Sequence, residues 1–213
     1  IFIGGTARLA SVVEKLVPLM AAAFLLGALI VVIVRIKYIP EAFGLIFKYA
    51  FAPQAIIGGG IGAALKTAIS QGAKRGLFSN EAGMGSTPHA HAQANVKTPH
   101  EQGAVAIASV FIDTGVVLTL NALVIISTLY VTGGPLHDCG AAAELSDVFT
   151  KTNLAQTAFG VVYGEKAGAA FIAVALFFFA FSTILGWNMF GKTNVAYLFG
   201  NTGVKVYTVI SLG

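Results

Sequence analysis

The stretch Leu16–Val34, LVPLMAAAFLLGALIVVIV, decides which class of fold this chain can adopt. It contains no charged residue, and charged residues flank it at Glu14, Lys15 and Arg35. As an α-helix it would be about 28 Å long, close to the thickness of the hydrocarbon core of a bilayer. The sequence therefore predicts a membrane-spanning helix at about residues 16–37.

The composition of the whole chain is also that of an all-α polytopic membrane protein. Of its 213 residues, 56% are hydrophobic and 10% are charged, whereas a globular protein has roughly 25% charged residues. The mean hydropathy is +0.82. The net charge of +4 does not indicate nucleic acid binding, because the longest basic run is Lys74–Arg75. The single cysteine, Cys139, excludes a disulfide framework or a thiolate metal site within this chain.

Three more apolar stretches predict membrane spans, so we expect four spans in a single membrane domain. Their approximate limits are residues 53–76, 102–130 and 167–190. A histidine-containing loop is expected at 77–101, and a segment at 131–166 is expected to cap the protein outside the membrane.

The positively charged residues predict the orientation of these spans. One side of the membrane would collect eight lysines and arginines, and the other side five. Because the excess lies on the cytoplasmic side, we place the N-terminus, residues 77–101 and the C-terminus in the cytoplasm. The sequence starts at Ile1 and ends in the apolar residues 206–213, so we expect an internal piece of a longer polypeptide.

A glycine-rich run interrupts the second expected span. Gly58, Gly59, Gly60 and Gly62 form the stretch of lowest helix propensity in any span. A helix that unwinds inside a membrane exposes N–H and C=O groups that bind ions and zwitterions. These glycines are therefore candidate substrate-binding residues for a small ligand. Close helix packing through the Gly58 and Gly62 pair is the alternative explanation.

Two adjacent hydroxyls lie within the fourth expected span. Ser182 and Thr183 offer the hard oxygen ligands that a sodium ion prefers, although hydroxyls in membrane helices usually bond to a carbonyl one turn earlier. Trp187 follows Thr183 by one turn on the same helix face, so it is a candidate substrate contact that closes the site. The alternative is an ordinary aromatic residue of the membrane interface.

Asp113 is the one charged residue of the third expected span. A carboxylate within a membrane is costly and indicates a functional role: it could accept a proton, bind a cation or cap polar groups of a neighbouring helix. His89 and His91 are expected in a solvated loop and do not indicate a metal site, because residues two apart project to different faces of a helix. No nucleophile and base pair typical of an enzyme is present.

The residues Gly76–Ser86, GLFSNEAGMGS, resemble the signature of the alanine or glycine:cation symporter family, the sodium:alanine symporters. Further blocks resemble family blocks in the same order along the chain. These blocks are residues 15–21, 50–55, 71–76, 110–114 and 179–187. The resemblance covers nearly the whole chain.

This resemblance implies a leucine-transporter-like fold, with two inverted repeats of five helices around a site at the middle of the membrane. The four spans would be its fifth to eighth helices. Ser182 and Thr183 would complete a sodium site with the first helix, and the glycine run would be the partner of that broken helix. Ser79, Asn80 and Glu81, near the cytoplasmic end of the second span, would form an inner gate.

From these features we expect a multi-pass protein of the plasma membrane, the inner membrane of a bacterium. It would import alanine or glycine in symport with sodium by alternating access. Sodium would be the coupling ion, no other cofactor is expected, and membrane lipid would be the remaining partner. Two alternatives stay open: a proton-coupled carrier that uses Asp113, and a non-transporting structural subunit whose glycines and hydroxyls serve only packing.

Overall fold

A computed structural model of the chain describes residues 5–51, 70, 72–81, 84–137 and 153–211. Within these residues every regular element is helical and none is a strand. The elements are α1 (Gly5–Val34), η2 (Ile36–Tyr38), α2 (Ile39–Phe51), α4 (Thr87–His91), α5 (Pro99–Val110), η4 (Phe111–Leu118), α6 (Thr119–Ile125), η5 (Ile126–Tyr130), α7 (Leu154–Tyr163) and α8 (Glu165–Ile210). Residues 72–79 are helical as well. Elements η4 and η5 are π-helices.

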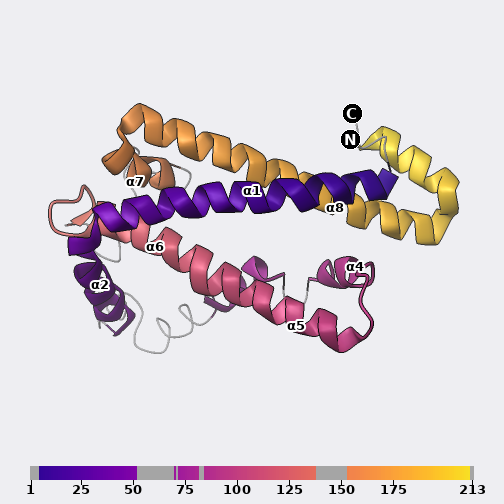
Figure 1. Ribbon diagram of the computed structural model, residues 1–213, viewed down its shortest axis with the longest axis horizontal. Helices are drawn as coiled ribbons and strands as arrows, with labels where there is room; N and C mark the ends of the chain where they lie inside the picture. Colours follow the sequence, from indigo (N-terminus) through magenta and orange to yellow (C-terminus); the bar gives the residue numbers. More distant parts are fainter. Residues whose placement is uncertain (1–4, 52–69, 71, 82–83, 138–152, 212–213) are drawn as a thin grey trace.

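Three long apolar helices form the body of the structure (Figure 1). They are α1, α8 and a composite helix, Pro99–Tyr130, in which α5, η4, α6 and η5 follow one another. Each is long and apolar enough to cross a membrane. Three of the expected spans fall on these helices, and the second expected span, residues 53–76, lies mostly outside the described residues. The leucine-transporter-like arrangement stays a prediction.

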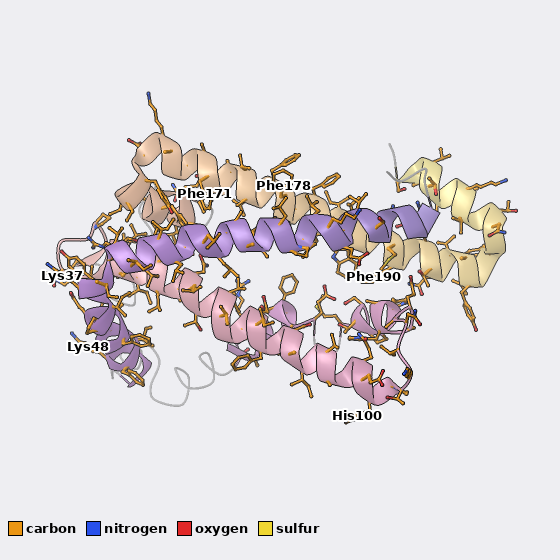
Figure 2. All side chains as sticks on the ribbon, in the orientation of Figure 1. Lys37, Lys48, His100, Phe171, Phe178 and Phe190 are labelled. Carbon is orange, nitrogen blue, oxygen red and sulfur yellow. The ribbon has the colours of Figure 1, made fainter. Side chains whose placement is uncertain are left out.

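The long helices separate two ends of the molecule (Figure 1). Helix α4, the start of α5 and both chain termini lie at one end, whereas α2 and α7 lie at the other. Figure 2 shows the side chains in the same orientation, with Lys37 and Lys48 at the α2 end and His100 toward the opposite end.

Residues 77–101 and 131–166 were expected on opposite sides of the membrane. Helix α4 and the start of α5 lie at one end and α7 at the other, whereas Ser79 and Asn80 contact the middle of the composite helix. Which end is cytoplasmic remains a prediction.

Helix α8 is longer than the fourth expected span. It continues past residue 190, and its backbone leaves the helical conformation at Gly200, with φ 64° and ψ −163°, where the chain turns back on itself (Figure 1). A positive φ of this size favours glycine. The charge of Lys192 suggested an earlier end, but lysine is a good helix former and this side chain is buried.

A glycine-lined hairpin joins α7 to α8. Gly164 makes the turn, with φ 86°, and the two helices then approach so closely that a Cβ on Gly168 would meet the backbone of Gly160 and Phe159. Phe159 is fully buried and stacks on Phe171 with ring centroids 5.4 Å apart. Small residues therefore determine how close these helices come, as in other membrane helix pairs.

The hairpin packs against α1 through both a hydrogen bond and close contact. The hydroxyl of Tyr163 donates to the carbonyl of Gly27 at 2.9 Å, and the ring of Phe171 fills the space that a Cβ on Gly27 would need. Burial of Tyr163 raises the pKa of its phenol. The main buried cluster lies around these contacts and includes Val31 and Leu129.

Polar contacts tie α2 to the end of the composite helix. Arg35 Nε donates to the Ser127 carbonyl at 2.9 Å, and its guanidinium lies 3.9 Å from the centre of the Tyr38 ring. Glu41 accepts bonds from both the hydroxyl and the N–H of Thr132, at 2.7 Å each. These two donors hold the pKa of the Glu41 carboxyl below its usual value, because they favour the charged form.

Gly168→Ala should destabilise the protein, because its Cβ would lie on the backbone of Gly160, which cannot swing away as a side chain can. Overpacking of this kind costs roughly 1–3 kcal/mol. We expect a lower midpoint of thermal unfolding for the whole protein in detergent. Gly186→Ala on the same helix is the control, since nothing lies within 4 Å of a Cβ there. Equal midpoints for the two variants would show that the α7–α8 contact does not stabilise the protein.

Candidate functional site

The hydroxyls expected to bind sodium lie on α8, one turn beyond Phe179. Ser182 Oγ and Thr183 Oγ1 both donate to the Phe179 carbonyl, at 2.9 Å each. This is the local bond that hydroxyls in membrane helices usually make. It leaves the oxygen lone pairs available, because a hydroxyl that donates its proton can still accept. Sodium binding by these two residues stays a prediction.

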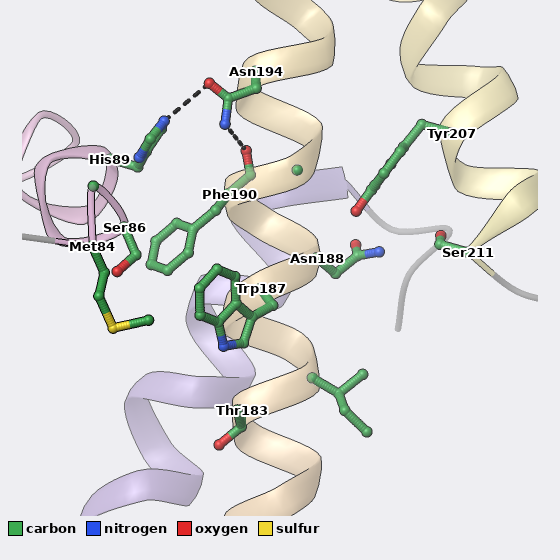
Figure 3. A pocket seen from close by; sticks show the side chains of 13 residues that line it. Met84, Ser86, His89, Thr183, Trp187, Asn188, Phe190, Asn194, Tyr207 and Ser211 are labelled. Carbon is green, nitrogen blue, oxygen red and sulfur yellow. Dashed lines mark hydrogen bonds between the residues drawn. The ribbon is translucent and has the colours of Figure 1, made fainter. Parts of the chain in front are cut away.

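Thr183 and Trp187 line one cavity, of about 660 Å³, beside α8 (Figure 3). Trp187 is 47% exposed and meets Phe190 edge to face, with ring centroids 5.9 Å apart. The remaining lining residues are Met84, Gly85, Ser86 and His89, then Ile184, Asn188, Phe190, Gly191 and Asn194, and finally Tyr207 and Ser211. Of the three α8 residues singled out from the sequence, Thr183 and Trp187 thus line a space that can admit a small ligand, and Ser182 is not among its lining residues.

Side-chain contacts hold α4 on α8. The Nε2 atom of His89 lies 3.0 Å from Oδ1 of Asn194, and its ring lies 5.8 Å from that of Phe190. Gln93 Nε2 donates to the hydroxyl of Thr193 at 3.2 Å. His89 was expected in a solvated loop; it lies in the short helix α4, and these contacts, which are exposed, join residues that are 100 or more positions apart. Among the described residues, no group of three or more His, Cys, Asp or Glu side chains is placed to hold a metal ion.

The signature stretch reaches the composite helix through a pair of hydrogen bonds. Ser79 Oγ donates to Asp113 Oδ2 at 3.0 Å, and Thr114 Oγ1 donates to Asn80 Oδ1 at 3.1 Å. Asn80 Nδ2 also donates to the Gly76 carbonyl at 3.0 Å. We call Ser79, Asn80, Asp113 and Thr114 the clasp. In the clasp, the adjacent residues Ser79 and Asn80 bond to the adjacent residues Asp113 and Thr114 of the composite helix.

The clasp lies at the middle of the composite helix. Asp113 and Thr114 belong to the π-helix η4 and lie about 20 Å along the helix from Pro99. The sequence prediction placed residues 79–81 near the cytoplasmic end of the second span, but Ser79 and Asn80 contact this midpoint instead. The order of the segments along the sequence does not show that residues 79 and 80 contact the middle of the composite helix, because that contact depends on how the segments pack. π segments within helices frequently occur at functional sites.

Glu81 closes the loop that follows the clasp. Its backbone has a positive φ of 52°, which is uncommon for a residue other than glycine. The hydroxyl of Ser86 donates to Glu81 Oε2 at 2.6 Å, and Ser86 is almost fully buried. This bond links Glu81 to a residue that lines the α8 cavity.

The structure identifies polar residues that the sequence reasoning missed. Thr114, His89 and Asn194 make contacts between distant segments, and Asn188 is buried on α8 with an Oδ1 atom that has no hydrogen-bond partner. For Asn188 and Asn194, the sequence signal of a functional or structural role was an amide side chain within an apolar helix. Gly58, Gly59, Gly60 and Gly62 lie outside the described residues, so their role stays a prediction.

A double-mutant cycle should show coupling between Asn80 and Thr114. Asn80→Ala and Thr114→Val each remove one partner of the same hydrogen bond, so we expect a coupling energy of about 0.5–1.5 kcal/mol. The measurement is the unfolding free energy of the whole protein in detergent. Thr119→Val is the control, because the Thr119 hydroxyl bonds to the Thr114 carbonyl of its own helix. Additive effects of Asn80→Ala and Thr114→Val would contradict the clasp.

Known proteins similar to this chain are transporters. An uncharacterised transporter of Haemophilus influenzae is 38% identical over 207 residues, which are 97% of this chain and 42% of that protein. The sodium/alanine symporter AgcS of Methanococcus maripaludis is 36% identical over 209 residues, 98% of this chain and 43% of that protein. The sodium/proton-dependent alanine carrier protein of Bacillus sp. strain PS3 is 38% identical over 196 residues, 92% of this chain and 43% of that protein.

These similarities extend from one end of the chain to the other. The chain spans about two fifths of the length of the curated relatives it matches. The family model of the sodium:alanine symporters matches residues 1–213. The resemblance first seen at Gly76–Ser86 is thus confirmed, and the chain belongs to the sodium:alanine symporter family.

Proposed function

We propose that this chain is part of a secondary transporter that imports alanine or glycine together with sodium by alternating access. The main support is the match to the sodium:alanine symporter family over the whole chain. The plasma membrane is its proposed location, because three helices are long and apolar enough to span one. The membrane potential would drive uptake, since one charge moving through 100 mV gains about 2.3 kcal/mol.

Ser182 and Thr183 are the proposed sodium ligands of this chain. Their protons are engaged with the Phe179 carbonyl, so each oxygen presents only lone pairs to its surroundings. Such an oxygen can bind a cation and cannot donate to an anion. The local helix bonds thus orient the ligands before the ion arrives, which lowers the cost of binding.

The substrate would bind beside these ligands. Trp187 lines the same cavity as Thr183 and offers an apolar wall to a small side chain. Gly58, Gly59, Gly60 and Gly62 are the proposed backbone contacts to the amino acid, because an unwound helix presents free N–H and C=O groups. The absence of side chains at these positions leaves room for a small substrate only.

The clasp, together with Glu81, is the proposed gate. It links the helical residues 72–79 to Asp113 at the middle of the composite helix through hydrogen bonds that can break and re-form. Alternating access requires one group of helices to move against another. A side-chain link of this kind can stabilise one of the two conformations without a covalent constraint.

Uptake of radiolabelled alanine by the whole protein in proteoliposomes tests this function. We expect uptake to depend on a sodium gradient, and Thr183→Ala to raise the half-saturating sodium concentration roughly tenfold, because it loses an oxygen ligand worth about 1.4 kcal/mol. Thr208→Ala is the matched control, since Thr208 makes the same type of helix bond, to the Val204 carbonyl, and is not among the residues lining the cavity.

Three other results would change the account. Sodium-independent uptake that Asp113→Asn abolishes would transfer coupling from sodium to a proton on Asp113. An equal sodium requirement in wild type and Thr183→Ala would exclude this threonine as a ligand. Absence of uptake under any ion gradient would favour a structural subunit.

A further inference from the structure

Asn188 of α8 carries a buried amide that a ligand can reach at one atom. The residue is 6% exposed, and its Oδ1 atom is enclosed by protein and has no hydrogen-bond partner among the described residues. The Nδ2 atom is also unpaired in the described part of the chain, but it is not fully buried. Because Asn188 lines the cavity of Thr183 and Trp187, Nδ2 is the atom through which it can bind a ligand there.

The phenol of Tyr207 approaches α8 on the side of Asn188 (Figure 3). The chain turns back at Gly200, so the segment that contains Tyr207 lies beside the end of α8 (Figure 1). The Tyr207 hydroxyl lies against Gly191, at the place where a Cβ would be. Gly191 follows Asn188 by about one turn on the same helix face, and all three residues line the cavity. The missing side chain at Gly191 therefore lets the hydroxyl come close to this face of α8.

The amide of Asn188 and the phenol of Tyr207 offer protons that no described group accepts. The hydroxyls of the other lining residues, Ser86, Thr183 and Ser211, already donate to protein oxygens. The Tyr207 hydroxyl makes no hydrogen bond within the described residues and is not fully buried. A primary amide has two N–H donors and a phenol has one O–H donor. The ligand that fits these two groups is an acceptor.

The charged residues near the cavity favour an anion on this side of α8. Lys192 follows Asn188 by one turn on the same helix face, and its side chain is buried. No Asp or Glu is among the described residues that line the cavity. The carboxylate of Glu81 is bonded to Ser86, which lies on the opposite side of α8 from Tyr207 (Figure 3). An anion beside Tyr207 is therefore near a basic residue and away from this carboxylate.

We propose that Asn188 Nδ2 and the Tyr207 hydroxyl form a subsite that binds the carboxylate of the transported amino acid. This inference rests on the proposed function and adds a binding position for its substrate. Hydrogen bonds to an ionised acceptor are stronger than those between neutral groups, so two such donors can hold a carboxylate. Trp187 lines the same cavity and offers its apolar surface to the rest of the amino acid.

Two variants separate this role from a structural one. Tyr207→Phe keeps the ring and removes only the hydroxyl. Asn188→Leu has a similar size and removes both the free donor and the buried acceptor that has no partner, which is costly to leave unpaired. The ligand role predicts that both variants weaken carboxylate binding and that neither lowers the midpoint of thermal unfolding of the ligand-free protein. If the Tyr207 hydroxyl instead served to stabilise the fold, Tyr207→Phe would lower this midpoint and leave carboxylate binding unchanged.

Propionate tests the subsite without transport, because it has the carboxylate of alanine and no ammonium group. We expect propionate to raise the midpoint of thermal unfolding of the purified whole protein at constant ionic strength and sodium concentration, and ethylammonium, which has only the ammonium group, to have no effect. Tyr207→Phe should raise the propionate concentration that gives half of this effect roughly tenfold, as for a lost hydrogen bond to a charged group.

Tyr197→Phe is the matched control, since Tyr197 is 89% exposed on α8 and is not among the lining residues. An equal propionate requirement in wild type and Tyr207→Phe, or stabilisation by ethylammonium alone, would overturn the proposal.

Alanine uptake by the whole protein in proteoliposomes separates the subsite from the proposed function. We expect Tyr207→Phe to raise the KM for alanine roughly tenfold and Tyr197→Phe to leave it unchanged. Propionate binding that depends on Tyr207, without alanine uptake, would support the subsite and exclude the proposed function. Sodium-dependent uptake with the same KM in wild type and Tyr207→Phe would support the function and exclude the subsite.

Discussion

A polar group within an apolar helix must find its partner inside the protein, because lipid offers none. The described helices follow this constraint closely. Thr128, Ser182 and Thr183 donate to carbonyls of their own helices, and Asp113 accepts the hydroxyl of Ser79 from another segment. Asn188 on α8 is the exception, since its Oδ1 atom is buried and has no hydrogen-bond partner among the described residues.

Helix α8 is the scaffold on which the site depends. At one end the hairpin at Gly164 and the close approach at Gly168 fix it to α7 and, through Tyr163, to α1. Toward the other end α4 binds it through His89 and Gln93. The face with Thr183 and Trp187 lies between these attachments, and both side chains are exposed there.

The sequence predicted the features that local composition controls. The apolar stretches at 16–37, 102–130 and 167–190 correspond to long helices, and the Gly76–Ser86 stretch led to the correct family. The contact of Ser79 with Asp113 and that of His89 with Asn194 were not predicted, since they depend on how segments 34 and 105 positions apart pack. The π-helical turns have no sequence signal, and the extension of α8 beyond residue 190 was hidden by the charge of Lys192.

The central claim is that sodium and a small amino acid bind to this protein in a coupled manner. Equilibrium binding of radiolabelled alanine to the whole purified protein, in sodium chloride and in potassium chloride of equal ionic strength, tests it directly. The account predicts at least roughly tenfold tighter alanine binding in sodium, and saturating alanine should raise the sodium affinity by the same factor, because coupling between two sites is reciprocal. Equal alanine affinity in the two salts would contradict it.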